Sequence, residues 1–299
     1  MFKPLCRLNK RMIIFILFIL LINTSYYIWP YISDALRSFF TKIPYNFGLI
    51  ALFPALIAVF RAFFLTLLEA IDHKSLKYVK SSFLKGAVLW TTYYSISFFA
   101  LLLSSQLVKS LNISPVFNFN DLKLYGLEVL IFFIGVDFFY YWFHRSQHEF
   151  PVLWKFHEFH HSIENLTAAN STHHWSEEYF RIIPYTLPVA ILFQGTAENY
   201  MLVTAFILSW AGYIHCNSPR AALPNFLKYF VVDNRFHFAH HGKGNEYKNK
   251  NFGAFIPLWD VIFKTHYFSD EEKLPETGVE GKSEPNVIGF LKFTVPNDN

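Results

Sequence analysis

The stretch HRSQHEFPVLWKFHEFHH, residues 144–161, decides how the rest of the sequence is interpreted. It places five histidines within eighteen residues, directly after the apolar stretch LIFFIGVDFFYYWF at residues 130–143. Imidazole rings are polar and bind metals, whereas a continuous apolar stretch is buried or faces lipid. The junction of the two therefore predicts a polar site at the end of an apolar helix.

The composition predicts a membrane protein. Of the 299 residues, 53% are hydrophobic, 20% are aromatic and only 16% are charged, which is too apolar for an ordinary soluble domain. The net charge of +4 is small and scattered, so a nucleic-acid partner is excluded. The two cysteines, Cys6 and Cys216, make a disulfide framework improbable.

Four stretches approach the length of about 20 apolar residues that a helix needs to cross a bilayer. They are Met12 to Ile32, Phe47 to Leu68, Gly86 to Val108 and Leu124 to Phe143. A signal peptide is the alternative for the first stretch, because basic residues precede it, but no small-x-small cleavage site follows. The sequence thus predicts an all-α fold, a polytopic membrane helix bundle with about four spanning helices.

Basic residues orient these stretches in the membrane. Four lysines and arginines precede the first stretch, two follow it, four follow the second and two follow the third. Because cytoplasmic loops carry the excess of basic residues, we expect a cytoplasmic N-terminus and a cytoplasmic His144. Two later segments, Ile182–Phe193 and Tyr200–Ile214, are short for a full crossing and predict a shallow hairpin. The expected location is a bacterial inner membrane or the endoplasmic reticulum.

Three regions follow from this organisation. Residues 1–123 hold the N-terminal membrane helices, residues 124–268 hold the histidines, and residues 269–299 form a polar C-terminal tail that wraps the surface or is partly mobile. We expect the middle region to build a cytosolic helical cap around a histidine-rich dimetal site.

The histidines are grouped far beyond chance. Eleven of the thirteen fall between His144 and His241, and H-x-x-H-H occurs twice although about 0.02 copies would be expected at this histidine frequency. In a helix these spacings place two or three imidazoles on one face. Neutral imidazoles are good metal ligands, and eight to ten nitrogens suit two ions with four or five ligands each at about 2.1 Å.

Other histidines and nearby acids are candidates for additional metal ligands or for residues that orient the ligands. His73 and His266 are interpreted as ordinary polar residues, and His173 stays open between the two interpretations. Asp137 lies on the same helix face as His144 and is predicted to orient a ligand histidine. Glu149, Glu164 and Glu177 are weaker candidates for this role, with a plain solvated charge as the alternative for each. Cys216 could offer a thiolate or be a buried free thiol. HEFHH does not match the zinc-protease pattern H-E-x-x-H.

Several motifs resemble the fatty acid hydroxylase superfamily, which includes sterol desaturases and alkylglycerol monooxygenase. They are DFFYYWFHRSQHE, LWKFHEFHHSIENL and FHFAHHGKGNEYKNKNFGAFIPLWDVIFKT, between residues 137 and 266. By this resemblance the metal ligands are His144, His148, His157, His160, His161, His237, His240 and His241, with His174 and His215 as additions. Two departures are Lys264, where the family has glycine, and the STH sequence before His174, where the family has a stretch that contains arginine.

The resemblance implies a membrane-embedded di-iron enzyme that uses dioxygen and two electrons to hydroxylate or desaturate a lipid. The lipid could be a sterol, a fatty acyl chain, a sphingolipid or an ether lipid. The ligands alone do not name the metal, because imidazole suits zinc and copper as well as iron. No haem, nicotinamide or iron–sulfur motif is present in the sequence. We therefore expect a separate electron donor, which is a reductase, a ferredoxin, a small haem carrier or a pterin.

Three other functions are alternatives to a lipid oxygenase. A histidine-rich metal transporter or metal sensor would place its ligands within the spans, whereas these lie beyond the span ends. The second alternative is a relative that has lost catalysis, against which the intact histidine boxes argue. A membrane zinc hydrolase would be distinguished by its metal content.

Overall fold

The computed structural model describes residues 48–112, 114, 116–118, 127–194, 197–269 and 273–292. The expected all-α class is confirmed over these ranges, apart from two short strands, β1 (Phe117–Asn118) and β2 (Phe193–Gln194). The strands pair in parallel over their two residues, with Phe117 opposite Phe193. The predicted span from Met12 to Ile32 lies outside the described residues.

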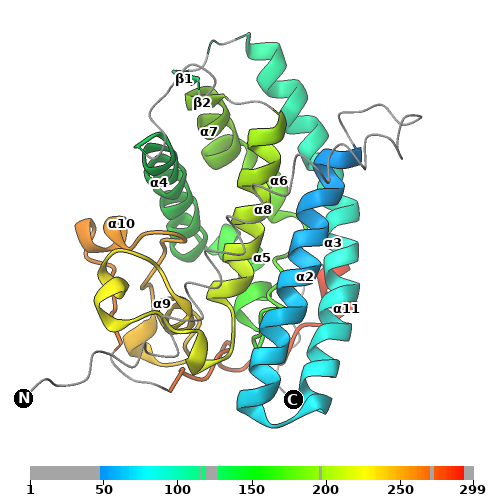
Figure 1. Ribbon diagram of the computed structural model, residues 1–299, viewed down its shortest axis with the longest axis vertical. Coiled ribbons are helices and arrows are strands. Elements are labelled where there is room, and N and C mark those ends of the chain that lie inside the picture. Colours follow the sequence, from blue (N-terminus) through cyan, green and yellow to red (C-terminus); the bar gives the residue numbers. More distant parts are fainter. Residues whose placement is uncertain are drawn as a thin grey trace, which may run out of the picture.

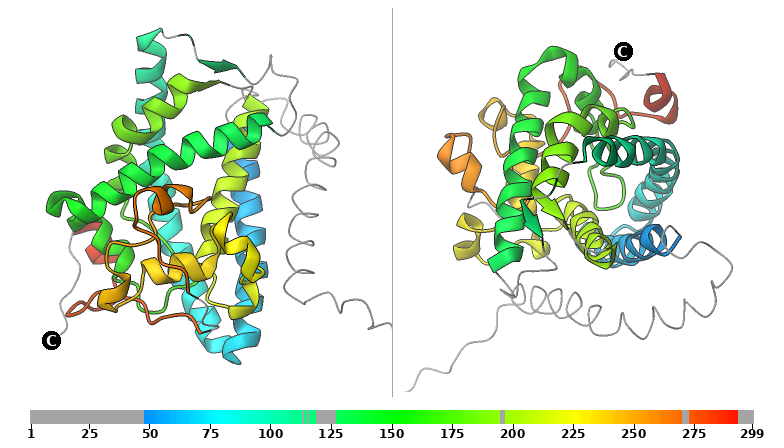
Figure 2. Two further views of the ribbon diagram at one scale, coloured as in Figure 1. Left: turned by 90° about the vertical axis from the view of Figure 1, so that its left-hand side faces the viewer. Right: turned by 90° about the horizontal axis from the view of Figure 1, so that it is seen from above.

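Four long helices form the frame of the molecule. They are α2 (Gly48–His73), α3 (Leu76–Leu111), α4 (Leu127–Glu149) and α8 (Ala197–Ile214). Helix α2 ends where Lys74 adopts a φ of 49°, a left-handed conformation that stops a helix. It packs along both α3 and α8 (Figure 1). Seen from above, the long helices stand around the middle of the molecule (Figure 2).

The predicted membrane spans are not confirmed. Within the described ranges, no helix combines the length and the apolar character required to cross a bilayer. Many large apolar side chains are nonetheless exposed on the outer faces of the long helices. They include Phe60, Phe63, Phe64 and Leu67 on α2, and Leu84, Val88, Phe99 and Leu103 on α3.

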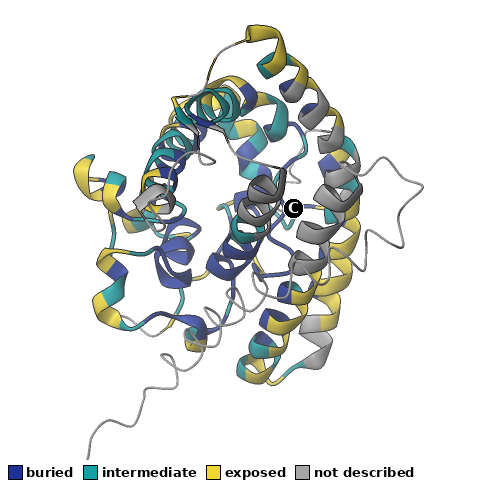
Figure 3. Cartoon of the chain, turned by 45° about the horizontal axis from the view of Figure 1, so that its top comes forward, coloured by how far each residue is buried: buried dark blue, intermediate teal, exposed yellow. Residues whose placement is uncertain are grey.

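Short helices and loops connect the long helices (Figure 1), and buried positions gather toward the middle of the molecule (Figure 3). The segments predicted as a shallow hairpin are helical, as η1, α7 and α8. The short elements are α5 (Pro151–His161), α6 (Glu177–Phe180), the π-helix η1 (Ile182–Thr186), α7 (Leu187–Leu192), η2 (Pro219–Ala221), η3 (Asn225–Tyr229), α9 (Asn234–His240), η4 (Asn245–Tyr247), α10 (Leu258–Ile262) and α11 (Val287–Lys292).

Helices α2 and α3 hold the loop that follows the second histidine box. A Cβ atom on Gly86 of α3 would lie 1.9 Å from the carbonyl oxygen of Ala169, so only glycine allows this close approach. On α2, the carboxylate of Glu69 accepts hydrogen bonds from the backbone amides of Ala168 (2.9 Å) and Asn217 (2.8 Å). The long N-terminal helices therefore fix two segments that lead to histidines.

The C-terminal segment 273–292 lies against the same end of the molecule. The hydroxyl of Thr277 donates to the carbonyls of Ile163 (3.0 Å) and Glu164 (2.8 Å). The indole of Trp175 donates to the carbonyl of Phe290, whose ring is fully buried. The described part of the predicted tail thus packs on the surface, while the region boundaries at residues 123 and 268 stay predictions.

Candidate metal centre

The corner between α4 and α5 brings together the first two histidine boxes. His144 and His148 lie one turn apart near the end of α4. Phe150 then adopts an extended conformation (φ −99°, ψ 117°), as expected before a proline, and Pro151 occupies the first turn of α5. The chain therefore turns between the two helices, and the last turn of α5 carries His157, His160 and His161.

The remaining histidines come from α8 and α9. His215 directly follows the last residue of α8. Helix α9 is capped by Asp233, whose side chain accepts a hydrogen bond from the amide of Phe236 at 3.1 Å. His237 and His240 lie in its last turn, and His241 is its C-terminal cap.

Nine of the ten predicted ligands converge in two adjacent groups. Within each group the possible ligand atoms all lie within 4.8 Å of one another. The first group is His144, His148, His157, His161 and His240. The second group is His160, His215, His237 and His241. The groups touch where the rings of His161 and His241 stack, with centroids 4.2 Å apart.

The Nε2 atoms point toward one another within each group. In the first group, the Nε2 atom of His157 lies 3.1 Å from that of His144 and 3.2 Å from that of His161. In the second group, the Nε2 atom of His215 lies 3.1 Å from that of His160 and 2.8 Å from that of His237.

In several of these rings the Nδ1 atom, which points away from the centre of its group, donates to a backbone carbonyl oxygen, and a carbonyl oxygen can only accept a hydrogen bond. The Nδ1–H of His144 donates to the carbonyl of Phe252 (2.8 Å), and that of His240 donates to the carbonyl of Lys250 (2.7 Å). In the second group, the Nδ1–H of His215 donates to the carbonyl of Ala211 at 2.6 Å. A neutral imidazole that donates from Nδ1 carries a lone pair on Nε2. These contacts therefore aim lone pairs at the centre of each group.

His160 and His157 are held in the same way. The Nδ1–H of His160 donates to the carbonyl of Thr172 (3.4 Å), and that of His157 donates to the carboxylate of Glu177 (3.3 Å). The close pair His144–His157 in the first group and the close pair His160–His215 in the second each set two lone pairs face to face. With both rings neutral and protonated at Nδ1, neither pair can form a hydrogen bond, and a cation between the nitrogens would make the contact favourable.

Burial keeps these rings neutral. Burial, followed by the charges of neighbouring imidazoles, lowers the pKa of His144, His148 and His161 well below the ordinary value. Burial likewise lowers the pKa of His215 and of His240 to about 3. The rings are therefore ready to bind a metal without first releasing a proton.

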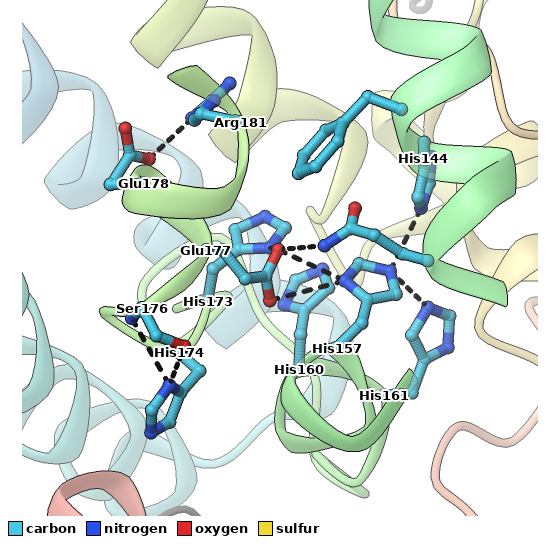
Figure 4. A network of polar contacts seen from close by, with 12 residues as sticks. His144, His157, His160, His161, His173, His174, Ser176, Glu177, Glu178 and Arg181 are labelled. Atoms are coloured by element: carbon cyan, nitrogen blue, oxygen red, sulfur yellow. Dashed lines mark hydrogen bonds and ion pairs between the residues drawn. The ribbon is translucent and has the colours of Figure 1, made fainter. Parts of the chain in front are cut away.

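Glu177 lies at the edge of the first group (Figure 4). Its buried carboxylate accepts hydrogen bonds from Gln147 (2.7 Å), His157 (3.3 Å) and His173 (3.2 Å). Although burial alone would raise it, the imidazoles of His173 and His157 lower the pKa of the Glu177 carboxyl well below its ordinary value. The arrangement is that of a carboxylate orienting a ligand histidine.

Glu177, one of the weaker candidates, is thus the acid that contacts a grouped histidine. His173 joins Glu177 and His157 in a third set of possible metal ligands, and its ring stacks on His160 with centroids 3.9 Å apart. His174 is not in either group, and its Nδ1 atom bonds to the hydroxyl of Ser176 at 2.7 Å.

The two acids singled out first lie elsewhere. Asp137 is fully buried, but its carboxylate accepts hydrogen bonds from the backbone amides of Ala254 (2.8 Å) and Phe255 (2.9 Å) rather than from a histidine. Glu149 forms an ion pair with Arg145 (2.7 Å) on the surface. The structure brings neither acid into contact with a grouped histidine.

The remaining candidate residues lie outside the two groups. Glu164 pairs with Lys243 at 2.9 Å. Cys216 is a buried free thiol, and burial raises its pKa well above the ordinary value, so it is not a thiolate. His73 contacts the carbonyl of Asn217, and the ring of His266 contacts that of Phe268.

The residues fit a pair of metal ions. The Nε2 atoms of His148 and His240 are buried and have no hydrogen-bond partner, which is costly for a polar atom unless a ligand binds it. Two imidazoles that bind one ion at about 2.1 Å, at roughly a right angle, have their nitrogens about 3 Å apart. The 3.1 Å separations in both groups agree with this geometry.

Comparisons with known proteins point the same way. The family model described as fatty acid hydroxylase matches residues 129–265, which include all ten predicted ligands. The chain is 29% identical to alkylglycerol monooxygenase of Homo sapiens over 140 residues, which are 47% of this chain and 31% of that protein. No solved structure matches the chain.

Two further relatives carry different names. The chain is 27% identical over 202 residues to the very-long-chain aldehyde decarbonylase GL1-7 of Oryza sativa, which covers 64% of this chain and 31% of the relative. It is 27% identical over 168 residues to the ornithine lipid hydroxylase OlsE of Rhizobium tropici, covering 56% and 49%. The chain thus spans 31% to 49% of the length of these relatives. Residues 129–265, in which both histidine groups lie, match the fatty acid hydroxylase family model.

Proposed function

We propose that this protein is a lipid oxygenase that holds one iron ion in each histidine group. One observation carries the proposal: in each group, two Nε2 atoms lie 3.1 Å apart with their lone pairs facing each other. A cation bound between the two nitrogens in each group would make this arrangement favourable. Three relatives are named as a lipid hydroxylase, a monooxygenase and a decarbonylase, so the proposed ions are redox-active. Zinc has no redox chemistry and would not serve such a reaction.

The bound ions and the protein side chains would contribute differently to the reaction. When bound, the ions supply the activation of dioxygen and the oxidation of a C–H bond. The protein fixes the ligand rings through Phe252, Lys250 and Glu177, and it excludes water by burying every grouped histidine except the half-buried His148.

The substrate is proposed to be a lipid that reaches the site from a membrane. Exposed apolar side chains on α2 and α3 support contact with lipid, because soluble monomers rarely expose so many in a contiguous area. Burial of each methylene of an alkyl chain contributes about 0.8 kcal/mol, which suits recognition of a long chain. We further propose that the histidine groups face the cytoplasm.

Electrons are proposed to come from a separate donor, either a redox protein or a tetrahydropterin. The proposal rests on the absence from the sequence of motifs for haem, nicotinamide or iron–sulfur binding.

The test begins with purification under anaerobic conditions and a count of iron and zinc. About two irons per chain are expected. Dioxygen consumption is then measured with an alkylglycerol, an ornithine lipid and a long-chain aldehyde, each with a reduced ferredoxin or a tetrahydropterin. Lipid-dependent oxygen uptake and an oxidised lipid product are the expected results.

Matched variants connect the activity to the two groups. His144→Ala and His215→Ala each remove one ligand and are expected to abolish turnover, whereas His266→Ala, which changes an exposed histidine outside both groups, keeps it. If the purified protein contains zinc instead of iron and hydrolyses a lipid ester, it is a hydrolase and the oxygenase proposal is wrong. Full turnover of His240→Ala with His241→Ala would refute a histidine-bound centre.

A further inference from the structure

The stretch Lys250–Asn251–Phe252 lies beside the first group and holds two of its five rings. The carbonyl of Lys250 accepts the Nδ1–H of His240 (2.7 Å), and the carbonyl of Phe252 accepts the Nδ1–H of His144 (2.8 Å). The direction of both Nε2 lone pairs therefore depends on where this stretch of backbone lies.

Asn251 stands between these two carbonyls and is fully buried. Its φ of 62° is in the left-handed region, which asparagine tolerates better than most residues. Its side-chain amide donates to the carbonyls of Phe236 (2.8 Å) and Tyr267 (2.9 Å), and its side-chain oxygen accepts from the amide of Tyr267 (2.6 Å). Both of its N–H donors and its oxygen are thus used.

The contact with Phe236 connects the stretch to α9. Phe236 directly precedes His237 in that helix, which carries His240 of the first group as well as His237 of the second. Of these two rings, His240 is the one whose Nδ1–H is held by the stretch, at the carbonyl of Lys250. Asp260 fixes the residues that follow, because its carboxylate accepts from the amides of Phe252 (2.8 Å) and Gly253 (2.7 Å).

We propose that Asn251 is a positioning residue of the first group. Its side chain fixes the carbonyls of Lys250 and Phe252, which in turn fix the rings of His240 and His144. This role rests on the proposed metal centre and adds to it a residue that contacts no metal and no substrate. Loss of the side chain is expected to weaken metal binding in the first group and to leave the second group intact.

The experiment isolates the two groups in the full-length protein. Changing His160 and His215 to Ala leaves the first group, and changing His144 and His148 to Ala leaves the second. Cobalt(II) is the probe, because its visible absorption reports binding by nitrogen ligands without turnover. Asn251→Gly is introduced into each background, since glycine keeps the left-handed backbone and removes only the side chain.

With only the first group present, Asn251→Gly is expected to weaken cobalt binding by about 10- to 100-fold, as for other residues that orient a ligand. With only the second group present, the affinity stays within about twofold. Thr277→Val is the matched control, because the buried Thr277 hydroxyl also donates to two backbone carbonyls but contacts no histidine. It is expected to change neither affinity.

Equal weakening in both backgrounds would show a general effect on folding and would overturn the proposal, as would no weakening in either. If Asn251→Gly does not fold, Asn251→Ser carries the same comparison, and failure of both to fold also overturns a specific positioning role. The absence of cobalt binding to the unaltered protein is a separate result, because it refutes the metal centre itself.

Discussion

The Nε2 atoms of His160 and His215 lie 3.1 Å apart, although the two residues are 55 positions apart in the sequence. Each ring donates its Nδ1–H to a backbone carbonyl, that of Thr172 or of Ala211. Two lone pairs therefore face each other in a buried site. A bound cation converts this repulsion into two coordination bonds.

Metal binding is therefore expected to stabilise the fold. A ligand present at a thousand times its dissociation constant stabilises the native state by about 4 kcal/mol. Removal of metal by a chelator should lower the melting temperature in detergent, and readdition of iron(II) should restore it. His266→Ala should behave like the unaltered protein, whereas a melting temperature that does not respond to metal would contradict the role of the two groups.

The metal-free protein is expected to lose stability in acid. An unfolded histidine binds a proton below a pH of about 6.5, whereas His215 and His240 in the folded protein do so only below about 3. The unfolded state therefore binds more protons between these values, so the free energy of unfolding falls as the pH drops from about 6.5 toward 3. Each such proton contributes about 1.4 kcal/mol per pH unit.

Denaturant titrations of the metal-free protein at several pH values measure this slope. His215→Gln should reduce it by about one proton. A free energy of unfolding that does not change between pH 7 and pH 4 would contradict the burial of neutral rings.

The two acids Asp137 and Glu149 should differ sharply on substitution. Asp137→Ala leaves buried backbone amides without an acceptor and should cost about 3 kcal/mol or more. Glu149→Ala removes only a surface ion pair with Arg145 and should cost less than about 1 kcal/mol. Chemical denaturation of the two variants side by side measures the difference, and equal costs would show that the contacts of Asp137 matter little.

Lys264→Gly is expected to stabilise the protein. Lys264 follows α10 with a φ of 60°, a conformation that glycine adopts without the steric cost borne by lysine. A gain of about 0.5–1 kcal/mol remains after allowance for the greater freedom of glycine in the unfolded chain.

The control is Lys248→Gly, because Lys248 has an ordinary φ of −59°. At position 248 glycine relieves no backbone strain, and it makes the unfolded chain more flexible. The free energy of unfolding is therefore expected to fall by about 0.4–1 kcal/mol. Comparison of the melting temperatures checks both signs, and a destabilised Lys264→Gly would show that the left-handed conformation carries no strain.

The sequence predicted the grouping of histidines because their spacing on helices is visible in the sequence alone. It left His173 open and took His174 as a ligand only by the family resemblance, since neither lies within a helix whose period would show which ring faces inward. For Asp137, the helix face was a poor guide, because its partners are backbone amides more than 100 residues away.

The partners of the outer ring nitrogens were also beyond sequence reasoning. Four of the grouped rings donate to carbonyls, and backbone carbonyls occur at every residue. Asn251 and Asp260 lie in a segment that resembles the family. However, the contacts of Asn251 are made from a left-handed backbone conformation, and those of Asp260 are with backbone amides, which residue types do not reveal.

The two groups also differ in how far their members are separated along the chain. Four of the five histidines of the first group lie within residues 144–161, whereas those of the second are drawn from positions 160 to 241. Closing long loops costs more entropy than closing short ones. During synthesis most ligands of the first proposed metal site are therefore together as soon as the α4–α5 corner forms, whereas the second proposed site is complete only after α8 and α9 have folded.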